Sequence, residues 1–324
     1  MTAVQNTVTD TNLLAEQGWA SLPASYRTPR QTPTLEQAQQ YCRILAETHY
    51  ENFHVASRLL PQRLRPHFHS IYAYCRISDD LGDEVSEPAQ ALALLDLWQQ
   101  ELDACYRGEA RHPVFVALRE TIRICDIPQE PFADLLTAFR QDQVVTRYAT
   151  MAEVLDYCRY SANPVGRLVL YACGYRDAER FALSDETCTA LQLANFWQDV
   201  REDWDHGRVY LPQDAMAAAG VDELTIANRR GTAAFRALMQ QQVEYAREMF
   251  GRGARLIGMV DRELAVDLDL FTRGGLEILR AIERRQYDVL SARPTISKQR
   301  KALLLLRALA GRFLPGARPA GNLA

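Results

Sequence analysis

The sequence predicts an all-α protein that forms a single-domain helical bundle. From Leu35 onward, apolar residues recur at the spacing of a helix, and the alternation of apolar and polar residues that marks strands is almost absent. Proline stands at the start of several periodic segments, where its missing N–H costs a helix nothing. No linker rich in Gly, Ser or Pro divides the chain, so we expect one domain.

The elements follow in order along the chain. Residues 1–33 are polar and rich in proline, so we expect a poorly ordered N-terminal arm. The domain should cover residues 34–313, with a flexible tail at 314–324. We expect helices at 34–48, 66–84, 88–108, 113–127, 131–143, 152–174, 185–204, 232–257, 261–285 and 297–313.

Local signals refine this series of helices. Thr34 should cap the first helix by accepting a hydrogen bond from the backbone. Asn163-Pro164 lies in the middle of the segment 152–174, where proline should kink the helix and free a backbone carbonyl. The segment Gly207–Pro212 should break the helical pattern.

The composition is that of an ordinary soluble globular protein, with 324 residues, 48% hydrophobic and 24% charged. A net charge of −4 argues against nucleic acid as a partner. The seven cysteines are odd in number and contain no Cys-x-x-Cys, so we expect reduced core residues in the cytoplasm. Nothing before the first basic residue, Arg27, forms the apolar stretch of a signal peptide, so we expect none. The longest aliphatic run, Leu303–Leu306, is far shorter than the roughly 20 residues of a membrane span.

Two acidic motifs carry the chemistry. Asp79 and Asp83 are four residues apart, and so are Asp199 and Asp203. Residues four apart share one face of a helix, where two carboxylates repel each other unless a cation lies between them. Mg²⁺ takes one or two carboxylates and completes its shell with water and phosphate oxygens. The pairs therefore predict Mg²⁺ sites suited to a diphosphate.

The residues that lead into each motif favour a binding site over a solvated acidic surface. Tyr72 and Arg76 precede Asp79 at helical spacing, so an apolar stripe turns acidic at its end. Asn195 shares a face with Asp199 and Asp203, with aromatic residues close by. This pattern is typical of the lining of a cavity.

Other chemistries find little support in the sequence. Neither nucleotide-loop motif occurs, no Gly-x-Ser-x-Gly indicates a serine hydrolase, and the His and Cys residues lack zinc spacing. A di-iron bundle needs two Glu-x-x-His motifs; Glu51/His54 and Glu109/His112 match, but the second lies in an expected loop. A non-catalytic isoprenoid-binding protein would not need paired carboxylates. Both remain remote alternatives.

Three segments together resemble the squalene/phytoene synthase family, over about residues 40–290. They are Asp79-Asp80-x-x-Asp83-Glu84, Tyr157-Cys158-x-Tyr160-x-Ala162-x-x-x-Gly166, and Asn195-x-x-x-Asp199-x-x-x-Asp203 followed by Gly207-Arg208-x-x-x-Pro212. The resemblance implies the isoprenoid synthase fold, in which two Asp-rich helices face each other across a central apolar cavity. It also implies a prenyl diphosphate substrate.

The family's functional residues carry over by position. The resemblance implies that Asp79, Asp83, Asp199 and Asp203 hold Mg²⁺, with Asp80, Glu84 and Asn195 in support. It places Arg76 and Arg208 on diphosphate oxygens, and Tyr72, Tyr160 and Tyr210 along the site. Tyr160 matches a tyrosine implicated in catalysis among relatives.

Departures from the family pattern suggest one branch. Gln198 stands where phytoene and presqualene diphosphate synthases carry Arg. Tyr160-Ser161-Ala162-Asn163-Pro164-Val165-Gly166 stands where squalene synthases usually read Tyr-Val-Ala-Gly-x-Val-Gly. Asn163 and Gln198 are therefore candidate substrate-binding residues. This combination resembles the bacterial hydroxysqualene synthases of the hopanoid pathway, which implies water capture of the carbocation without NADPH. The alternatives are a squalene synthase that uses farnesyl diphosphate and NADPH, and a presqualene diphosphate or phytoene synthase.

The last expected helix is basic and amphipathic. Lys298, Arg300, Lys301 and Arg307 flank the run Leu303–Leu306. One interpretation is that the helix packs its leucines on the core. The other is that it docks loosely on an anionic membrane.

Overall fold

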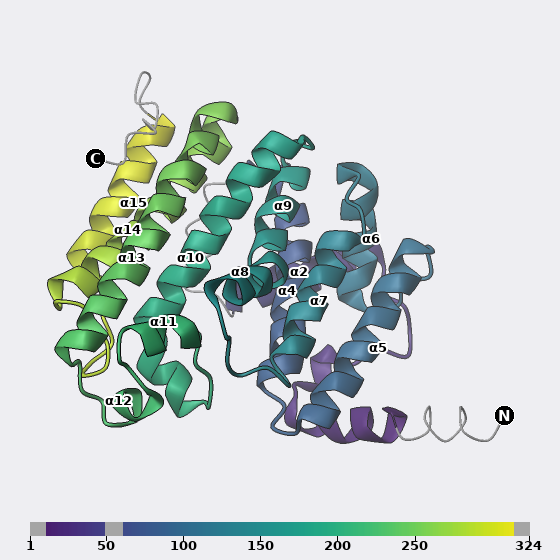
Figure 1. Cartoon of the computed structure of the whole chain (residues 1–324). Coiled ribbons are helices and arrows are strands. Elements are labelled where there is room, and N and C mark those ends of the chain that lie inside the picture. The colour runs from purple at the N-terminus through teal and green to yellow at the C-terminus, as the bar shows by residue number, and fades with distance from the viewer. Residues whose placement is uncertain (1–10, 49–60, 314–324) are drawn as a thin grey trace. The chain divides into compact units, whose positions relative to one another are not determined.

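The computed structural model describes residues 11–48 and 61–313, and Figure 1 shows the helices along the chain. Within these ranges every regular element is a helix, apart from an isolated parallel bridge between Arg147 and Val209. The predicted all-α class is confirmed. Among the described helices, none is long and apolar enough to cross a lipid bilayer.

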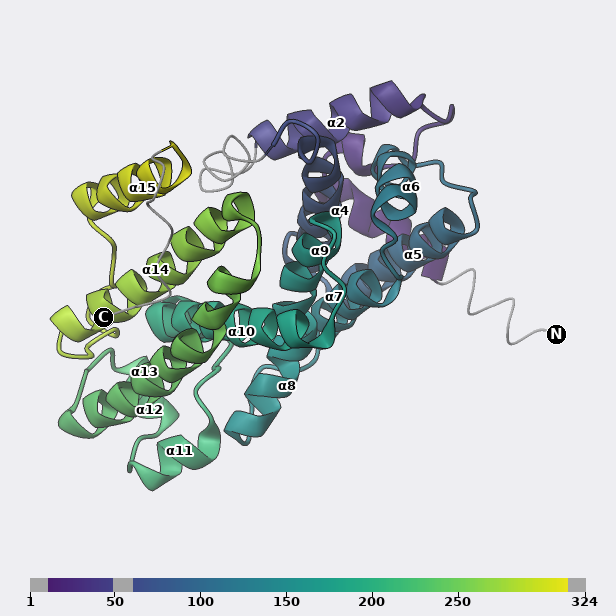
Figure 2. The same cartoon turned by 90° about the horizontal axis from the view of Figure 1, so that it is seen from above.

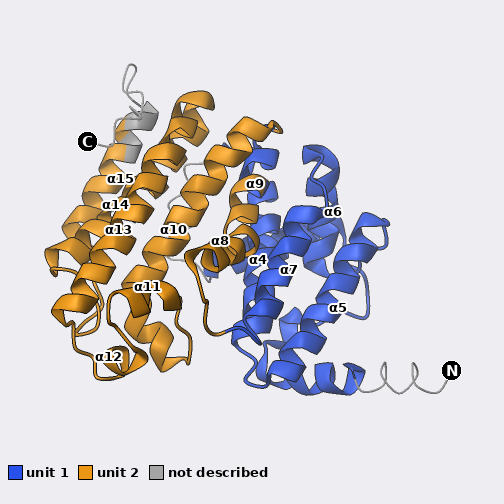
Figure 3. Cartoon of the chain, viewed as in Figure 1, with its two compact units in different colours: residues 1–145, 168–175 blue, residues 146–167, 176–324 orange. Residues whose placement is uncertain are grey.

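The chain falls into two compact units, which Figure 3 colours separately. Unit 1 comprises residues 1–145 and 168–175, and unit 2 comprises residues 146–167 and 176–324. The chain passes between the units three times, at 145/146, 167/168 and 175/176. They are therefore not sequential domains joined by a linker, in agreement with the absence of a linker composition.

Unit 1 surrounds a core of closely packed aromatic rings. Its elements are two short 3₁₀ turns, η1 (Trp19–Ser21) and η2 (Ala24–Tyr26), and helices α2 (Leu35–Thr48), α4 (Arg65–Asp83), α5 (Pro88–Tyr106), α6 (Pro113–Cys125) and α7 (Glu130–Gln141). The Tyr74 ring lies 5.0 Å from that of Phe132, and the Trp98 ring lies 4.5 Å from that of Phe115. Their polar atoms are satisfied, since Tyr74 donates to the Phe132 carbonyl and Trp98 donates to Ser78.

The predicted cap of α2 is confirmed. The Gln37 backbone N–H donates to Thr34 Oγ1 at 3.3 Å, and the Thr34 N–H donates to Gln37 Oε1 at 2.9 Å. This reciprocal pair is a capping box, which satisfies two backbone donors at the start of the helix. Prolines open α5 and α6 as the sequence predicts.

The N-terminal residues differ from the predicted poorly ordered arm. Residues 11–18 are helical, and Ala15, Leu22 and Tyr26 are buried in the core of unit 1. These apolar side chains are spaced too irregularly to mark an amphipathic helix, so only the tertiary packing reveals them. Residues 1–10 and 314–324 lie outside the described residues.

Unit 2 contains the longest helices. Its elements are α8 (Met151–Ser161), α10 (Ala178–Asp205), α11 (Gln213–Ala218), α12 (Glu223–Ala227), α13 (Ala233–Gly253), the 3₁₀ turn η3 (Ala254–Met259), α14 (Arg262–Arg284) and α15 (Lys298–Phe313). Helix α10 packs against both α13 and α14, and Figures 1 and 2 show α10 and α13 side by side. The sequence did not predict α11 and α12, because each spans fewer than two full turns.

The predicted kink is a complete break between α8 and α9 (Asn163–Ala172). Helix α8 ends at Ser161, and Pro164 lies in the first turn of α9, where it cannot donate to the preceding turn. Beyond the break, Gly166 lets α9 approach α10 closely: a Cβ atom there would lie 2.3 Å from Ser184 Oγ and 2.5 Å from Cys188 Sγ. The motif therefore needs glycine at this position for packing.

Candidate active site

The first acidic cluster is Asp79, Asp80, Asp83 and Glu84, at the C-terminal end of α4. The helix buries its apolar face up to Leu81 and then turns outward. Asp83 and Glu84 are exposed, and the Asp79 side chain is 45% exposed. Three of the four carboxylates can therefore be reached from solvent.

Asp80 differs from its predicted role as a supporting metal ligand. It is 4% exposed, and its carboxylate is occupied on both oxygens. Tyr26 donates its hydroxyl to Asp80 Oδ2 at 2.6 Å, and Arg76 Nε donates to the same oxygen at 3.0 Å while Arg76 Nη2 donates to Oδ1. The helical period causes this difference, because a residue next to Asp79 points about 100° away from the Asp79/Asp83 face.

Arg76 links two of these carboxylates. Besides its pair with Asp80, its Nη1 lies 3.6 Å from Asp79 Oδ2. The guanidinium is therefore already engaged at the acidic cluster, and a diphosphate would share it with Asp80.

Asp79 has an unusual protonation equilibrium. Partial burial, and next the repulsion by Asp83, raise the pKa of Asp79 to about 7, although the nearby Arg76 lowers it. Nearly half of the side chain remains open to solvent, so the charge of Asp83 is screened but still felt. A cation between the two carboxylates would remove this repulsion.

Unit 2 supplies the second acidic cluster, defined by Asn195, Asp199 and Asp203 on one face of α10. Asn195 is exposed, whereas the Asp199 side chain is only 14% exposed. Burial and the neighbouring Asp199 raise the pKa of Asp203 to about 7, and Arg208 opposes the shift. Asp203 Oδ2 is enclosed and has no hydrogen-bond partner.

Arg293 pairs with the second acidic cluster, and the sequence analysis did not identify it. Its Nε and Nη2 donate to the two oxygens of Asp199 at 2.5 and 2.8 Å. The two residues are 94 positions apart in the sequence. Arg293 lies in the segment between α14 and α15, which carries no helical periodicity. The signal that could have found it is the dipeptide Arg293-Pro294, an isolated basic residue in an expected loop.

Gln198 reaches the same segment. It is buried, and its Nε2 donates to the Pro294 carbonyl at 2.6 Å. Two consecutive residues of this loop are thus tied to two consecutive residues of α10. The neutral amide fills the position where the family pattern has a cationic Arg.

Aromatic rings lie beside the second acidic cluster. Tyr210 stacks on Phe196 with ring centroids 3.7 Å apart and planes 7° apart, and it also stacks on Tyr148 at 5.7 Å. Tyr157, a residue of the second motif for which the sequence predicts no role, lies 5.9 Å from Tyr210. Tyr210 thus belongs to a cluster of four rings, and its role along the substrate site stays a prediction.

The end of α8 carries the predicted Tyr160. Arg159 lies over the Tyr160 ring at 4.4 Å and donates to its hydroxyl. Beside it, Ser161 Oγ is enclosed without a hydrogen-bond partner. Asn163 is buried and accepts a hydrogen bond from Thr189 Oγ1 at 2.9 Å. Neutral polar groups therefore gather at the break between α8 and α9.

The two remaining predicted residues lie next to the acidic clusters in sequence. Tyr72 is a buried residue of α4, two turns before Asp79. The Arg208 N–H donates to the Asp203 carbonyl at 2.8 Å just after α10 ends.

The residues present fit a divalent metal. Each cluster offers carboxylates whose mutual repulsion a cation would relieve, and the enclosed Asp203 Oδ2 has no other partner. Among the residues that the structure describes, no three His, Cys, Asp or Glu side chains form a group able to hold a metal by themselves. Water and diphosphate oxygens would therefore complete the shell, as is usual for Mg²⁺.

The second motif of the di-iron alternative is not a metal site. Glu109 is 68% exposed and pairs with Arg107, whereas His112 is buried and caps α6 by accepting from the Val114 N–H. Both lie between α5 and α6, in the loop that the sequence predicts. Glu51 and His54 lie outside the described residues.

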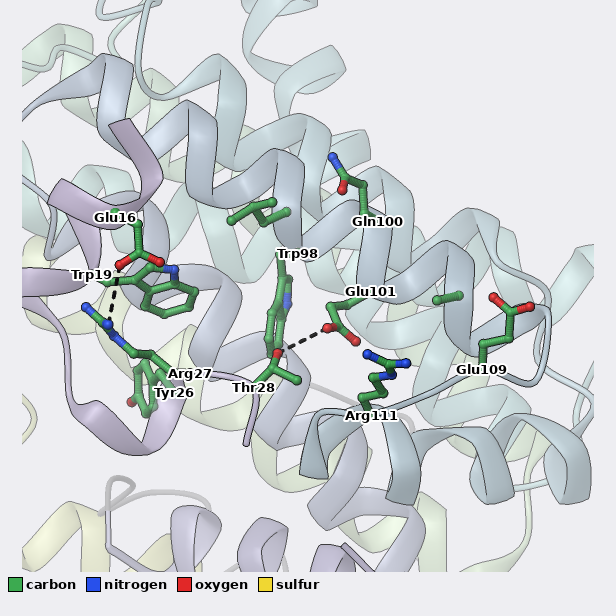
Figure 4. Close-up of a pocket in the computed structure, with 12 residues that line it drawn as sticks. Glu16, Trp19, Tyr26, Arg27, Thr28, Trp98, Gln100, Glu101, Glu109 and Arg111 are labelled. Atoms are coloured by element: carbon green, nitrogen blue, oxygen red, sulfur yellow. Dashed lines mark hydrogen bonds and ion pairs between the residues drawn. The ribbon is translucent and has the colours of Figure 1, made fainter. Parts of the chain in front are cut away.

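Unit 1 also contains a pocket of about 640 Å³ between the N-terminal segment and α5 (Figure 4). Trp19, Tyr26 and Trp98 line it, together with charged residues such as Glu16 and Arg27, which pair with each other at 3.4 Å. Tyr26 is the residue that this pocket shares with the contacts of the first acidic cluster.

Comparisons with known proteins agree with the motifs. Residues 46–300 match the family described as squalene/phytoene synthase. The crystal structure of squalene synthase HpnC from Alicyclobacillus acidocaldarius is 43% identical, covers 84% of this chain and 99% of its own, and has a TM-score of 0.76. Hydroxysqualene synthase from Sinorhizobium fredii is 40% identical over 178 residues, which are 54% of this chain and 60% of that protein.

A more distant relative matches over a longer stretch. The 15-cis-phytoene synthase from Synechococcus elongatus is 29% identical over 287 residues, covering 85% of this chain and 93% of that enzyme. The family match alone spans well over half of the 324 residues, including both acidic clusters. The chain therefore belongs to the squalene/phytoene synthase family.

Proposed function

We propose that this protein converts presqualene diphosphate into hydroxysqualene and diphosphate in a Mg²⁺-dependent reaction. The observation that carries the choice of branch is the set of neutral polar side chains, Ser161, Asn163 and Gln198, at positions where the family pattern has apolar, small or cationic residues. The identities of 43% and 40% with proteins named squalene synthase and hydroxysqualene synthase support it, against 29% for the phytoene synthase.

The proposed reaction needs no oxidant or reductant. The carbon–oxygen bond to the diphosphate breaks, and its electron pair leaves with the diphosphate. A water oxygen then forms a bond to the carbocation and releases a proton. Because no hydride is transferred, NADPH is not expected to take part.

The acidic clusters would hold the metal. The proposed ligands are Asp79, Asp83, Asp199 and Asp203, with Glu84 and Asn195 in support. When bound, Mg²⁺ neutralises the diphosphate and stabilises it as a leaving group. Arg76 and Arg208 would contact diphosphate oxygens, and Asp80 would act indirectly by holding Arg76.

Aromatic and polar side chains would then control the carbocation. The faces of Tyr72, Tyr160 and Tyr210 can stabilise a nearby positive charge by cation–π contact. Ser161 Oγ, enclosed and without a partner, can hold a water by a hydrogen bond without adding a charge that repels the cation.

Product analysis tests this proposal. Purified protein is incubated with presqualene diphosphate and Mg²⁺, with and without NADPH, in ¹⁸O-water. We expect labelled hydroxysqualene in both reactions. Unlabelled alcohol would rule out solvent capture, and squalene formed only with NADPH would place the protein in the reductive branch.

The other family reactions remain the runners-up. A squalene synthase would turn farnesyl diphosphate and NADPH into squalene, and a presqualene diphosphate or phytoene synthase would stop earlier or use a longer substrate. Each is distinguished by incubation with farnesyl or geranylgeranyl diphosphate and identification of the products. Iron analysis of the purified protein would separate all of these from a di-iron protein.

We also propose that α15 docks this cytoplasmic enzyme loosely on an anionic membrane. The helix carries five basic residues and no acidic one, in a chain whose net charge is −4. Leu303 and Leu306 are 58% and 63% exposed. A pocket of about 400 Å³ between α14 and α15 is lined by Arg273, Arg280, Arg300 and Arg307, with Glu277 and two leucines. Basic residues beside exposed leucines are typical of helices that lie at a membrane interface.

Co-sedimentation with vesicles tests the docking. The full chain should bind phosphatidylglycerol vesicles and not phosphatidylcholine vesicles, and Leu303→Ser/Leu306→Ser should weaken binding without changing the charge. Equal, negligible binding by the full chain and by a chain without residues 297–324 would leave α15 with only its packing on α14.

A further inference from the structure

We propose that Tyr26 is a positioning residue for the first acidic cluster, holding Asp80 so that Arg76 keeps its place beside Asp79. The inference rests on the proposed role of that cluster as a metal site. Tyr26 belongs to no motif of the sequence and precedes the residues matched by the family.

The contact is buried at both ends. Tyr26 is 1% exposed and Asp80 is 4% exposed, and their hydrogen bond measures 2.6 Å. Burial, together with the neighbouring Asp80, raises the pKa of Tyr26 well above its usual range, so the hydroxyl stays protonated and remains a donor. Removing a hydrogen-bond donor from a buried carboxylate lowers the free energy of unfolding, because no water replaces the donor.

Tyr26 is itself held in place by other parts of unit 1. It closes the 3₁₀ turn η2, and the preceding residue, Ser25, accepts a hydrogen bond from the Tyr41 hydroxyl at 2.8 Å. Figure 4 shows Tyr26 beside Arg27 in the pocket of the N-terminal segment, where Arg27 pairs with Glu16. The N-terminal segment thus acts as a fixed support for a side chain that reaches α4.

The contacts continue from Asp80 to the exposed carboxylates. Arg76 donates to both oxygens of Asp80 and leaves Nη1 at 3.6 Å from Asp79. Without the tyrosine hydroxyl, Arg76 would be the remaining donor in this chain of contacts to the Asp80 side chain, and it should move toward Asp80. Arg76 would then leave its place 3.6 Å from Asp79, and a diphosphate at this cluster would lose a cationic partner. Binding of Mn²⁺ together with diphosphate should therefore weaken at this cluster.

The test compares Tyr26→Phe with Tyr74→Phe. Tyr74 is a matched control, because it is a fully buried tyrosine of α4 whose hydroxyl donates at 2.8 Å to a backbone carbonyl, that of Phe132, and to no acidic residue. Mn²⁺ binding in the presence of inorganic diphosphate is measured by electron paramagnetic resonance from pH 6 to pH 8. Both variants should lose stability, but only Tyr26→Phe should weaken Mn²⁺ binding, by roughly tenfold at pH 7.

A second variant keeps the test decisive if Tyr26→Phe does not fold. Asp80→Asn retains an acceptor for Tyr26 but cannot pair ionically with Arg76, so it should also weaken Mn²⁺ binding. The double variant should show little further loss, since both changes break one chain of contacts. Unchanged Mn²⁺ binding in Asp80→Asn, or equal losses in Tyr26→Phe and Tyr74→Phe, would overturn the proposal.

The outcome is separable from the proposed function. Metal binding is read without turnover, so a protein that binds Mn²⁺ through Tyr26 and Asp80 but forms no hydroxysqualene would contradict only the proposed reaction. A protein that forms hydroxysqualene while Tyr26→Phe leaves Mn²⁺ binding intact would contradict only the positioning role.

Discussion

Single residues of the same type have different tasks in this protein. Asp79 and Asp203 carry pKa values raised to about 7, because burial and a carboxylate one turn away both disfavour their charged forms. Asp80, next to Asp79 in sequence, accepts hydrogen bonds from Tyr26 and Arg76. Asp199 is neutralised by Arg293. The identity of the side chain does not determine its role; its neighbours do.

The raised pKa of Asp203 predicts that Asp203→Asn stabilises the metal-free protein. The folded state holds this proton up to about pH 7, whereas an unfolded Asp loses it near pH 4. The unfolding free energy contributed by this group therefore falls as pH rises between these values and stays low above pH 7. Removing the charge should raise the melting temperature at pH 8, by about 2–4 °C for each kcal/mol recovered, and less at pH 5.5.

Asp205→Asn is the matched control for this prediction. Asp205 lies in the last turn of the same helix but forms an exposed ion pair with Arg229 at 2.9 Å. Its replacement should leave the melting temperature within about 2 °C, since exposed pairs contribute about 0–1 kcal/mol. A loss of stability in Asp203→Asn at pH 8 would contradict the prediction that the charged Asp203 side chain destabilises the folded protein.

The same pKa values predict that metal binding releases protons. Asp79 and Asp203 are about half protonated near pH 7, and a metal binds only the deprotonated form. Mg²⁺ affinity should therefore rise with pH through 7 and level off above 8. Calorimetry in buffers of different ionisation enthalpy measures the protons released. A Mg²⁺ affinity that is constant from pH 6 to pH 8 would argue against these carboxylates as ligands.

At the scale of whole elements, helices are positioned by close backbone approaches. Helix α9 begins directly after the break at Ala162 and meets α10 through Gly166. This contact fixes the end of α8, with Tyr160 and Ser161, relative to α10, which carries Asp199 and Asp203. Pro164 and Gly166 therefore determine how these helices lie against each other.

Gly166→Ala should destabilise the fold by roughly 1–3 kcal/mol, as overpacking of a close contact does. The added Cβ would lie 2.3 Å from Ser184 Oγ. Gly251→Ala in α13 is the control, because nothing lies within 4 Å of its Cβ position, and a helical Gly→Ala exchange there should stabilise by about 0.5–1 kcal/mol. Urea denaturation measures both. Similar changes in unfolding free energy in the two variants would mean that helix propensity, and not packing, determines the effect of Gly166→Ala.

At the scale of the whole molecule, the protein combines a net charge of −4 with two acidic clusters and one basic helix, α15. An anionic ligand would therefore be repelled by the clusters unless cations accompanied it. The raised pKa values of Asp79 and Asp203 also predict that bound metal stabilises the protein.

We expect Mg²⁺ and inorganic diphosphate together to raise the melting temperature, with little effect from diphosphate alone. A ligand at one hundred times its dissociation constant stabilises by about 2.7 kcal/mol. Differential scanning fluorimetry with EDTA, diphosphate, Mg²⁺ and the pair measures this, and Asp83→Ala should abolish the combined shift. A full shift with diphosphate in EDTA would show that the metal is not required for binding.

The sequence by itself determined the helical class, the family and most helix boundaries. These properties depend on short stretches of sequence. They are the period of apolar residues, the capping pair of Thr34 and Gln37, the proline that ends α8, and two carboxylates four residues apart. Because each depends on residues within about two helical turns, it can be predicted from the sequence alone. The predicted start of helix α10 was still seven residues too late, because its N-terminal cap, Asp177, precedes a weakly apolar stretch.

Only the tertiary structure decided which acidic residues are occupied and what supports them. Tyr26 meets Asp80 across 54 residues, and Arg293 meets Asp199 across 94 residues. No local pattern records such contacts, because the free energy of a buried hydrogen bond or ion pair depends on elements that fold against each other from distant parts of the chain. For the same reason, the short helices α11 and α12 and the buried residues of the N-terminal segment emerged only with the packing.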